Sequence, residues 1–239
     1  MRSLSFALLI TLFAFAGEPP LEPKIPHATL VREDLFAGIL ANDMQRFERG
    51  VKTVDRLLAE RPKDKPSLLA WKGLTNILRA VKASEKGDDI EFQMKYRDAL
   101  LNFADASDDG PQDPGVAAVI GGTYAIYGDR LPEKYRKGAW SMAYRNYQKL
   151  WKMQASAVEK LPLHIKGELL SGLALTAQRT GQLQESAQFV DRIIASMPGT
   201  PYEAAARKWK QDPASAARVK IACLSCHDIG RLEQVKRRG

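Results

Sequence analysis

This chain of 239 residues lacks a strand pattern, lacks a long apolar run and has only three histidines. No series of alternating β-branched residues and no hairpin signal occurs, which argues against a sheet. The longest apolar stretch is too short to cross a bilayer, so we expect no transmembrane segment. Three histidines leave general acid–base catalysis few candidate groups, and we expect a protein that is not an enzyme of that kind.

The first 16 residues have the three parts of a secretory signal peptide. Arg2 supplies a short positive region, Leu4–Phe13 is an almost uninterrupted apolar run, and Ala14-Phe15-Ala16 forms a small-x-small cleavage site. A buried N-terminal core helix is the alternative, but it would need no cleavage site. We therefore expect export to the periplasm or another extracytoplasmic space. A lipid anchor is not indicated, because no cysteine lies near the cleavage point.

The charge of the chain is basic, with 36 Lys and Arg against 28 Asp and Glu. Removal of the signal peptide takes away Arg2 alone, which leaves 35 bases against 28 acids, a net charge of about +7. A basic surface favours acidic protein partners through electrostatic steering. Nucleic acid is not expected as a partner, because it lies in another compartment. Most of the positive charge is also spread along helices as isolated side chains, and only Lys236-Arg237-Arg238 is a concentrated run.

From about residue 27 to residue 214 the sequence has the period of α-helices. An apolar stripe at helical spacing, Val51–Leu58, follows a break in the pattern at Asn42-Asp43. The clearest loop, residues 108–114, ends with an aspartate in capping position and a proline at the first helical position. Helices are expected at about 29–61, with that break, and at about 116–127, 132–160, 165–180 and 183–196. Two further helices are expected to carry the apolar residues found within 68–81 and within 92–103.

Two features of this region invite a functional interpretation but are better explained by packing. The aromatic stripe Trp140, Tyr144, Tyr147 and Trp151 has helical spacing, which is more typical of a core between stacked helices than of a cofactor wall. The pair Gly121-Gly122 is expected to allow close helix packing rather than phosphate binding, since no strand precedes it.

The last expected helix pair resembles a tetratricopeptide repeat. Its second helix and the following turn, from Gly181 to Pro198, match that repeat's second half, and Leu170, Leu173, Ala174 and Ala177 occupy positions of its first helix. A looser match runs from Trp71 to Pro111, with extra residues around Gly87. The resemblance covers about a third of the chain and implies antiparallel helix pairs, each of which buries its apolar face on a neighbour.

Cys223-Leu224-Ser225-Cys226-His227 has the C-x-x-C-H spacing of covalent haem attachment. On a helical turn residues i and i+3 point to the same side, so both thiols can reach the two vinyl groups of one porphyrin. The next residue directs its imidazole at the iron from the same face. This motif resembles that of c-type cytochromes, which implies one covalent haem c attached through Cys223 and Cys226, with His227 as the proximal iron ligand.

Three other interpretations of the motif stay open. A thioredoxin-like redox pair needs a βαβ setting, whereas this chain has a helical pattern. A zinc site needs four ligands, so His27, His164 or a carboxylate would have to complete it. A disulfide within one helical turn would be strained and would leave His227 without a role.

The second axial ligand of the iron must come from upstream, because no histidine or methionine follows His227. A C-terminal motif followed by a basic residue is similar to that of the four-helix-bundle cytochromes c, but only the haem-attaching roles carry over from that likeness. We favour His164, because imidazole binds iron readily and a helix junction gives backbone freedom. Met197 is the next candidate, since the turn Met197–Pro201 resembles loops that present a methionine to haem, although the repeat pattern also explains its proline. An iron without a second protein ligand is the remaining alternative.

We therefore expect four segments and an all-α fold of stacked antiparallel helix pairs, a tetratricopeptide-like helical array with a C-terminal haem-bearing helix. The segments are a signal peptide (1–16), an extended leader (17–26), a helical-repeat domain (27–214) and a haem-attachment helix (215–239). The expected function is electron transfer to or from a redox partner protein with an acidic docking surface. Two alternatives remain: a scaffold that holds a peptide or subunit in its groove, with an accessory haem, and a five-coordinate haem sensor or enzyme.

Overall fold

The computed structural model describes residues 26–213 of the chain. Of these residues 88% are helical and none lies in a strand, which confirms the expected all-α fold for this part of the protein. The helices are α1 (His27–Ala41), α2 (Met44–Glu60), η1 (Pro62–Asp64), α3 (Lys65–Glu85), α4 (Asp89–Asp109), α5 (Pro114–Tyr127), η2 (Gly128–Arg130), α6 (Glu133–Gln154), η3 (Ala155–Lys160), α7 (Leu163–Arg179), α8 (Leu183–Ser196) and α9 (Pro201–Gln211).

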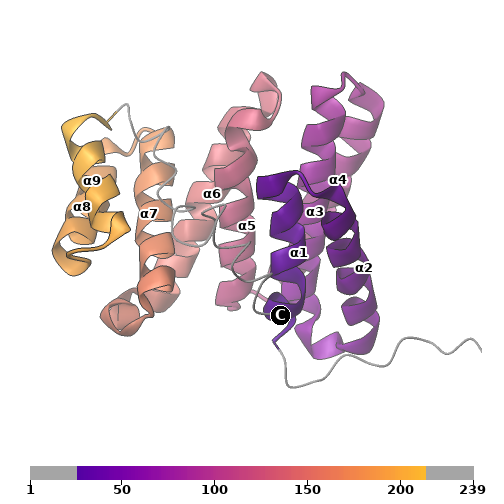
Figure 1. Cartoon of the computed structure of the whole chain (residues 1–239), viewed down its shortest axis with the longest axis horizontal. Helices are drawn as coiled ribbons and strands as arrows, with labels where there is room; N and C mark the ends of the chain where they lie inside the picture. Colours follow the sequence, from indigo (N-terminus) through magenta and orange to yellow (C-terminus); the bar gives the residue numbers. More distant parts are fainter. Residues whose placement is uncertain (1–25, 214–239) are drawn as a thin grey trace, which may run out of the picture.

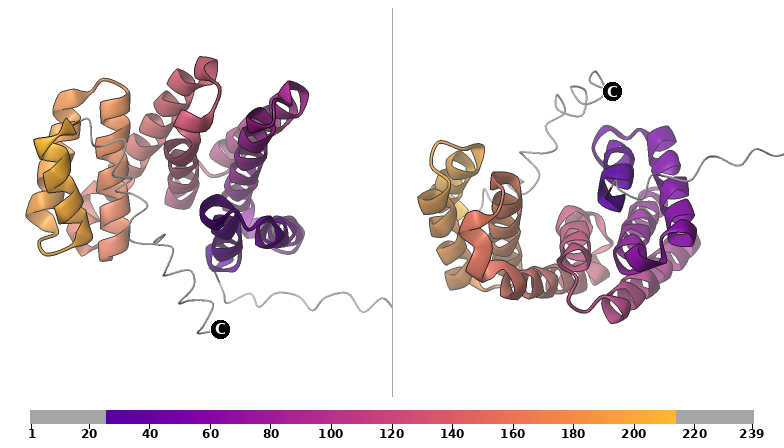
Figure 2. Two further views of the ribbon diagram at one scale, coloured as in Figure 1. Left: turned by 45° about the horizontal axis from the view of Figure 1, so that its top comes forward. Right: turned by 90° about the horizontal axis from the view of Figure 1, so that it is seen from below.

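The α-helices form antiparallel pairs that stack side by side (Figure 1). α1 pairs with α2, α3 with α4, α5 with α6 and α7 with α8, while α9 packs on α8 at one end of the array. The array bends into an arc that is open on its inner side (Figure 2, right). The expected helical array is therefore confirmed, and the tetratricopeptide resemblance stays a prediction.

Short caps and glycine turns explain where the helices begin and reverse. The carboxylate of Asp113 accepts a hydrogen bond from the Gly115 amide at 2.7 Å and so caps α5, as the loop at residues 108–114 predicts. Gly87, between α3 and α4, and Gly181, between α7 and α8, have φ angles of 77° and 83°. Such angles favour glycine, so each of these two pairs turns at a residue suited to the reversal.

The core is continuous along the array, although two clusters of side chains make it up. One cluster joins α1 to α6 around residues such as Leu35, Leu78 and Tyr127, and the other joins α5 to α9 around Leu170 and Ile193. Both include side chains of α5 and α6, so these two helices connect the halves. None of the helices between residues 26 and 213 is both long and apolar enough to cross a membrane.

The structure differs from the sequence-based helix limits in two places. The α-helix expected at 132–160 ends at Gln154, and residues 155–160 form the 3-10 helix η3. The helix α9 was not expected at all, because the prolines at 198 and 201 suggested only a turn. Thr200 caps α9 by accepting a hydrogen bond from the Glu203 amide, and Pro201 stands at the first helical position, where proline is well tolerated.

Candidate functional site

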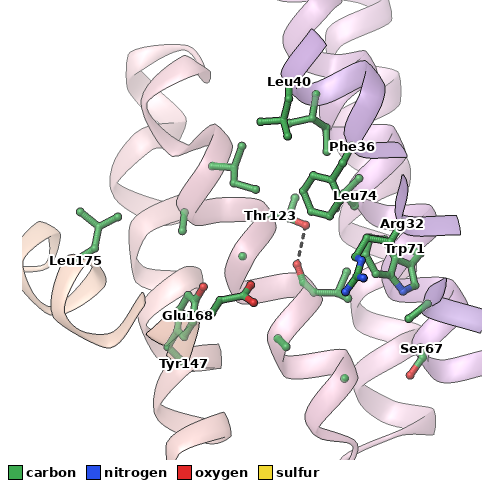
Figure 3. A pocket seen from close by; sticks show the side chains of 18 of the residues that line it. Arg32, Phe36, Leu40, Ser67, Trp71, Leu74, Thr123, Tyr147, Glu168 and Leu175 are labelled. Atoms are coloured by element: carbon green, nitrogen blue, oxygen red, sulfur yellow. Dashed lines mark hydrogen bonds between the residues drawn. The ribbon is translucent and has the colours of Figure 1, made fainter. Parts of the chain in front are cut away.

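A cavity of about 560 Å³ lies on the inner side of the arc (Figure 3). Its walls come mainly from α1, α3, α5 and α7, the first helix of each pair, and from two residues each of η2 and α6. We call it the inner groove. Its volume falls within the range of sites that hold a small molecule or a cofactor.

The walls of the inner groove are mostly apolar. Phe36 of α1 and Trp71 of α3 meet edge to face there, with ring centroids 6.3 Å apart, and Leu40 and Leu74 lie beside them (Figure 3). On α5, Gly122 leaves part of the wall without a side chain: a Cβ atom at this position would meet nothing closer than the Tyr147 hydroxyl oxygen, at 3.9 Å. The groove therefore suits a largely apolar group better than a sugar.

Two of the three histidines line the inner groove, although they lie far apart in the sequence. His27 begins α1, and its Nδ1 lies 3.4 Å from a carboxylate oxygen of Asp64 in η1. His164 stands in the first turn of α7. The array thus brings the candidate ligand His164 into the same cavity as His27.

Each ring nitrogen of His164 faces a defined partner. Nδ1 lies 3.2 Å from the hydroxyl oxygen of Tyr202 in α9, at hydrogen-bond distance. Nε2 lies 3.4 Å from a carboxylate oxygen of Glu168, one turn along the same helix. The second separation is longer than an ordinary hydrogen bond.

Glu168 is a groove residue that the sequence analysis missed. Desolvation by the surrounding helices raises the pKa of its carboxyl above the ordinary value, while the charge of Arg32 lowers it to a smaller extent. Its side chain remains 41% exposed. The sequence carried one signal for it, the four-residue spacing from His164, which puts both side chains on one helix face.

Three arginines contribute positive charge to the groove wall. Arg130 forms an ion pair with Glu85 at 2.6 Å, and Arg179 pairs with Asp129 and lies over the Trp140 ring, so both are held in place. Arg32 is held least, because its pair with Glu33 is at the 4.0 Å limit and its side chain is 46% exposed. Figure 3 shows Arg32 and Glu168 entering the groove from opposite walls.

Met197 lies away from the groove wall. It follows the end of α8, is only 2% exposed and packs in the core of α7, α8 and α9. The aromatic stripe of α6 lies largely in the core, since Trp140 and Tyr147 are buried and the Trp151 ring meets Phe189 edge to face, but Trp140 and Tyr147 also line the inner groove.

The haem-attachment motif, Cys223–His227, lies outside the described residues, as do residues 1–25. Between residues 26 and 213 no group of three or more His, Cys, Asp or Glu side chains is arranged to hold a metal ion. Comparisons with protein-family models, with curated proteins and with solved structures find no match to this chain.

Proposed function

We propose that this protein is an exported c-type cytochrome that transfers electrons through one covalently bound haem c. Cys223 and Cys226 attach the haem through thioether bonds, and the imidazole of His227 is the proximal iron ligand. The observation that carries the proposal is the sequence Cys223-Leu-Ser-Cys-His227 in a chain that begins with an export signal pattern. The haem supplies the one-electron chemistry, and the protein sets its environment.

The inner groove supports this proposal, because its residues fit a haem. A porphyrin is a flat apolar ring with two carboxylates, and the groove combines apolar walls with Arg32, Arg130 and Arg179. Its two imidazoles are chemically suitable axial ligands for iron. Of the two ligands favoured from sequence, the geometry favours His164, since Met197 would have to leave a packed core to reach an iron.

The curved array also favours a second function, a scaffold that holds a peptide or a subunit on its inner side, with the haem as an accessory. A five-coordinate haem sensor or enzyme is the third possibility. Carbon monoxide separates electron transfer from the sensor and enzyme roles: we expect little binding to the reduced protein if both axial positions are filled, and ready binding if one is open.

Covalent haem attachment is the test of the proposed function. The full chain, expressed together with a haem-attachment system, should yield a coloured product whose mass equals residues 17–239 plus one haem. Replacing both Cys223 and Cys226 by Ala should abolish the colour, while Ser225→Ala, which keeps the spacing of the motif, should not. A colourless wild-type protein would refute the proposal.

The basic charge of the mature chain leads to a prediction about how electron exchange with the redox partner depends on salt. Exposed charges are screened within about 8 Å at physiological ionic strength, so electron exchange with an acidic partner should slow as salt is added. A rate that stays constant across a salt series would instead indicate an apolar docking face.

A further inference from the structure

The C-terminal segment leaves the described part of the chain at the edge of the inner groove. The carbonyl of Pro213 accepts a hydrogen bond from Gln178 Nε2 at 2.7 Å, and the residue after Gln178, Arg179, lines the groove. Ten residue steps separate Pro213 from Cys223, which can span up to about 33–36 Å. His164 lies fourteen residues before Gln178 on α7, about 21 Å along the helix. The segment is therefore long enough for the motif to reach His164.

A haem attached to this segment needs a protein surface on which to bury its faces. The inner groove offers an apolar cavity of about 560 Å³ on the same chain. A tethered group also has an effective concentration in the millimolar range, which favours it over a free peptide or a second copy.

His164 is the groove residue best prepared to bind a metal. Iron-binding histidines commonly hydrogen-bond through one ring nitrogen, which fixes the ring, and coordinate through the other. The Tyr202 hydroxyl already holds Nδ1 of His164, and the more distant Glu168 faces Nε2. His27 has a comparable contact, with a carboxylate oxygen of Asp64 3.4 Å from its Nδ1, and it stands at the first residue of α1, so it is the competing candidate.

We propose that the inner groove is the haem pocket of this protein and that its occupant is the haem on residues 223–227 of the same chain. His164 is then the second axial ligand, and Arg32, the arginine with the weakest ion pair in the groove wall, faces the haem carboxylates. This inference rests on the proposed function and adds to it the residues that enclose and ligate the haem.

The first experiment changes the ligand. In the haem-loaded full-length protein, His164→Ala should convert the spectrum from low-spin to high-spin and open the reduced iron to carbon monoxide. His164→Met, which offers a different iron ligand from the same position, should restore a low-spin spectrum. The substitution His27→Ala tests the competing assignment, and loss of the low-spin spectrum in that variant alone would overturn the role of His164.

The second experiment fills the groove without touching a ligand. Gly122→Leu places a side chain in the open part of the wall, where nothing lies within 3.9 Å of the added Cβ. We expect it to keep its helical circular dichroism and to lose the low-spin spectrum. Gly138→Leu is the matched control, because Gly138 is an exposed helical glycine of α6 with nothing within 4 Å; it should leave the spectrum unchanged.

These outcomes separate the inference from the function on which it rests. A coloured wild-type protein whose spectrum is insensitive to both His164→Ala and Gly122→Leu would overturn the groove as haem pocket and leave the cytochrome proposal standing. A colourless wild-type protein would overturn both.

Discussion

The two histidines of the inner groove stand on walls that are built differently. Both walls use a glycine to bring a helix close to an aromatic ring: Gly38 of α1 lies against Phe47 of α2, and Gly167 of α7 lies against Tyr202 of α9. On the α1 wall the partner of the imidazole is not the aromatic ring but Asp64, whose carboxylate lies 3.4 Å from Nδ1 of His27. On the α7 wall the ring that packs on Gly167 also carries the hydroxyl that meets His164.

The α1 wall depends in addition on charge. Asp34 of α1 accepts hydrogen bonds from Arg46 Nε at 2.9 Å and from Arg49 Nε at 2.5 Å, which tie α1 to α2 at one end of the array. α7 lies inside the array, between α6 and α8 (Figure 1). Ion pairs weaken with acid and salt, whereas close packing does not. The comparison indicates that the two imidazoles are held by different means, His27 beside a carboxylate of η1 and His164 beside the hydroxyl of a packed tyrosine.

The largest expected effect on stability comes from adding a methyl group at Gly38 or Gly167, where a glycine lies against an aromatic ring. In Gly167→Ala the added Cβ would overlap the Tyr202 ring, and in Gly38→Ala it would lie 2.6 Å from Phe47 Cβ. We expect each change to lower the free energy of unfolding by about 1–3 kcal/mol, measured by chemical denaturation. Only Gly167→Ala should also alter the haem spectrum, because it displaces the partner of His164.

Gly138→Ala is the control for this pair, since it makes the same change at an open helical position and should stabilise the protein by up to about 1 kcal/mol. An unchanged haem spectrum in a destabilised Gly167→Ala protein would show that the position of His164 does not depend on Tyr202.

A smaller effect, confined to acid, is expected from Asp34→Asn. Burial alone would raise the pKa of Asp34, but hydrogen bonds from Arg49 and Arg46 outweigh it and hold the pKa below 3.8. A lowered folded-state pKa adds stability that is complete above the unfolded-state pKa and is lost as the pH falls through the folded-state pKa. The side chain is 14% exposed, so we expect a loss of about 1.5 kcal/mol at neutral pH.

The stability difference between wild type and Asp34→Asn should shrink as the pH falls below 3.8, which denaturation curves at several pH values would measure. Asp55→Asn is the matched control, because Asp55 forms an exposed ion pair with Lys72 and should change stability by about 0.5 kcal/mol or less. A difference that persists undiminished in acid would argue that the charge of Asp34, paired with Arg46 and Arg49, does not stabilise the contact between α1 and α2.

Most of the fold could be predicted because each helix pair is local. The break at Asn42-Asp43 is confirmed: Asn42, with φ of 54°, ends α1, and Asp43 caps α2. The sequence does not predict helix α9 because proline commonly ends a helix, although Thr200-x-x-Glu203 with Pro201 at the first position is also a helix-start pattern. Local rules admit both interpretations, and only the packing of Tyr202 and Trp209 on the neighbouring helices decides between them.

The inner groove could not be predicted in the same way. Its walls combine residues as distant in sequence as His27 and His164, and the curvature of the array, which no local pattern encodes, sets their separation. The burial of Met197 depends on the same long-range packing. The sequence therefore identified His164 as a chemical candidate, while its cavity, Glu168 and Arg32 became visible only in three dimensions.

The smallest expected change in stability comes from Tyr202→Phe, which removes one hydroxyl and keeps the ring on Gly167. Loss of a single hydrogen bond of this kind should lower the free energy of unfolding by about 1 kcal/mol or less. Its effect on the iron should be larger, because removing the partner that orients a ligating histidine commonly weakens metal binding about 10–100-fold. Carbon monoxide should therefore displace His164 from the reduced haem more readily, with a binding constant about tenfold higher at the low end of that range.

Tyr144→Phe is the matched control for this last comparison. The Tyr144 hydroxyl donates to Glu185 of α8, away from both imidazoles, so its removal should leave carbon monoxide binding unchanged. Since the two variants differ only in which hydroxyl is lost, a gain in affinity confined to Tyr202→Phe would tie the hydroxyl of α9 to the ligand on α7. Equal behaviour of the two variants would mean that the α7 wall positions its imidazole through the helix backbone alone, which would remove the main difference between the two walls.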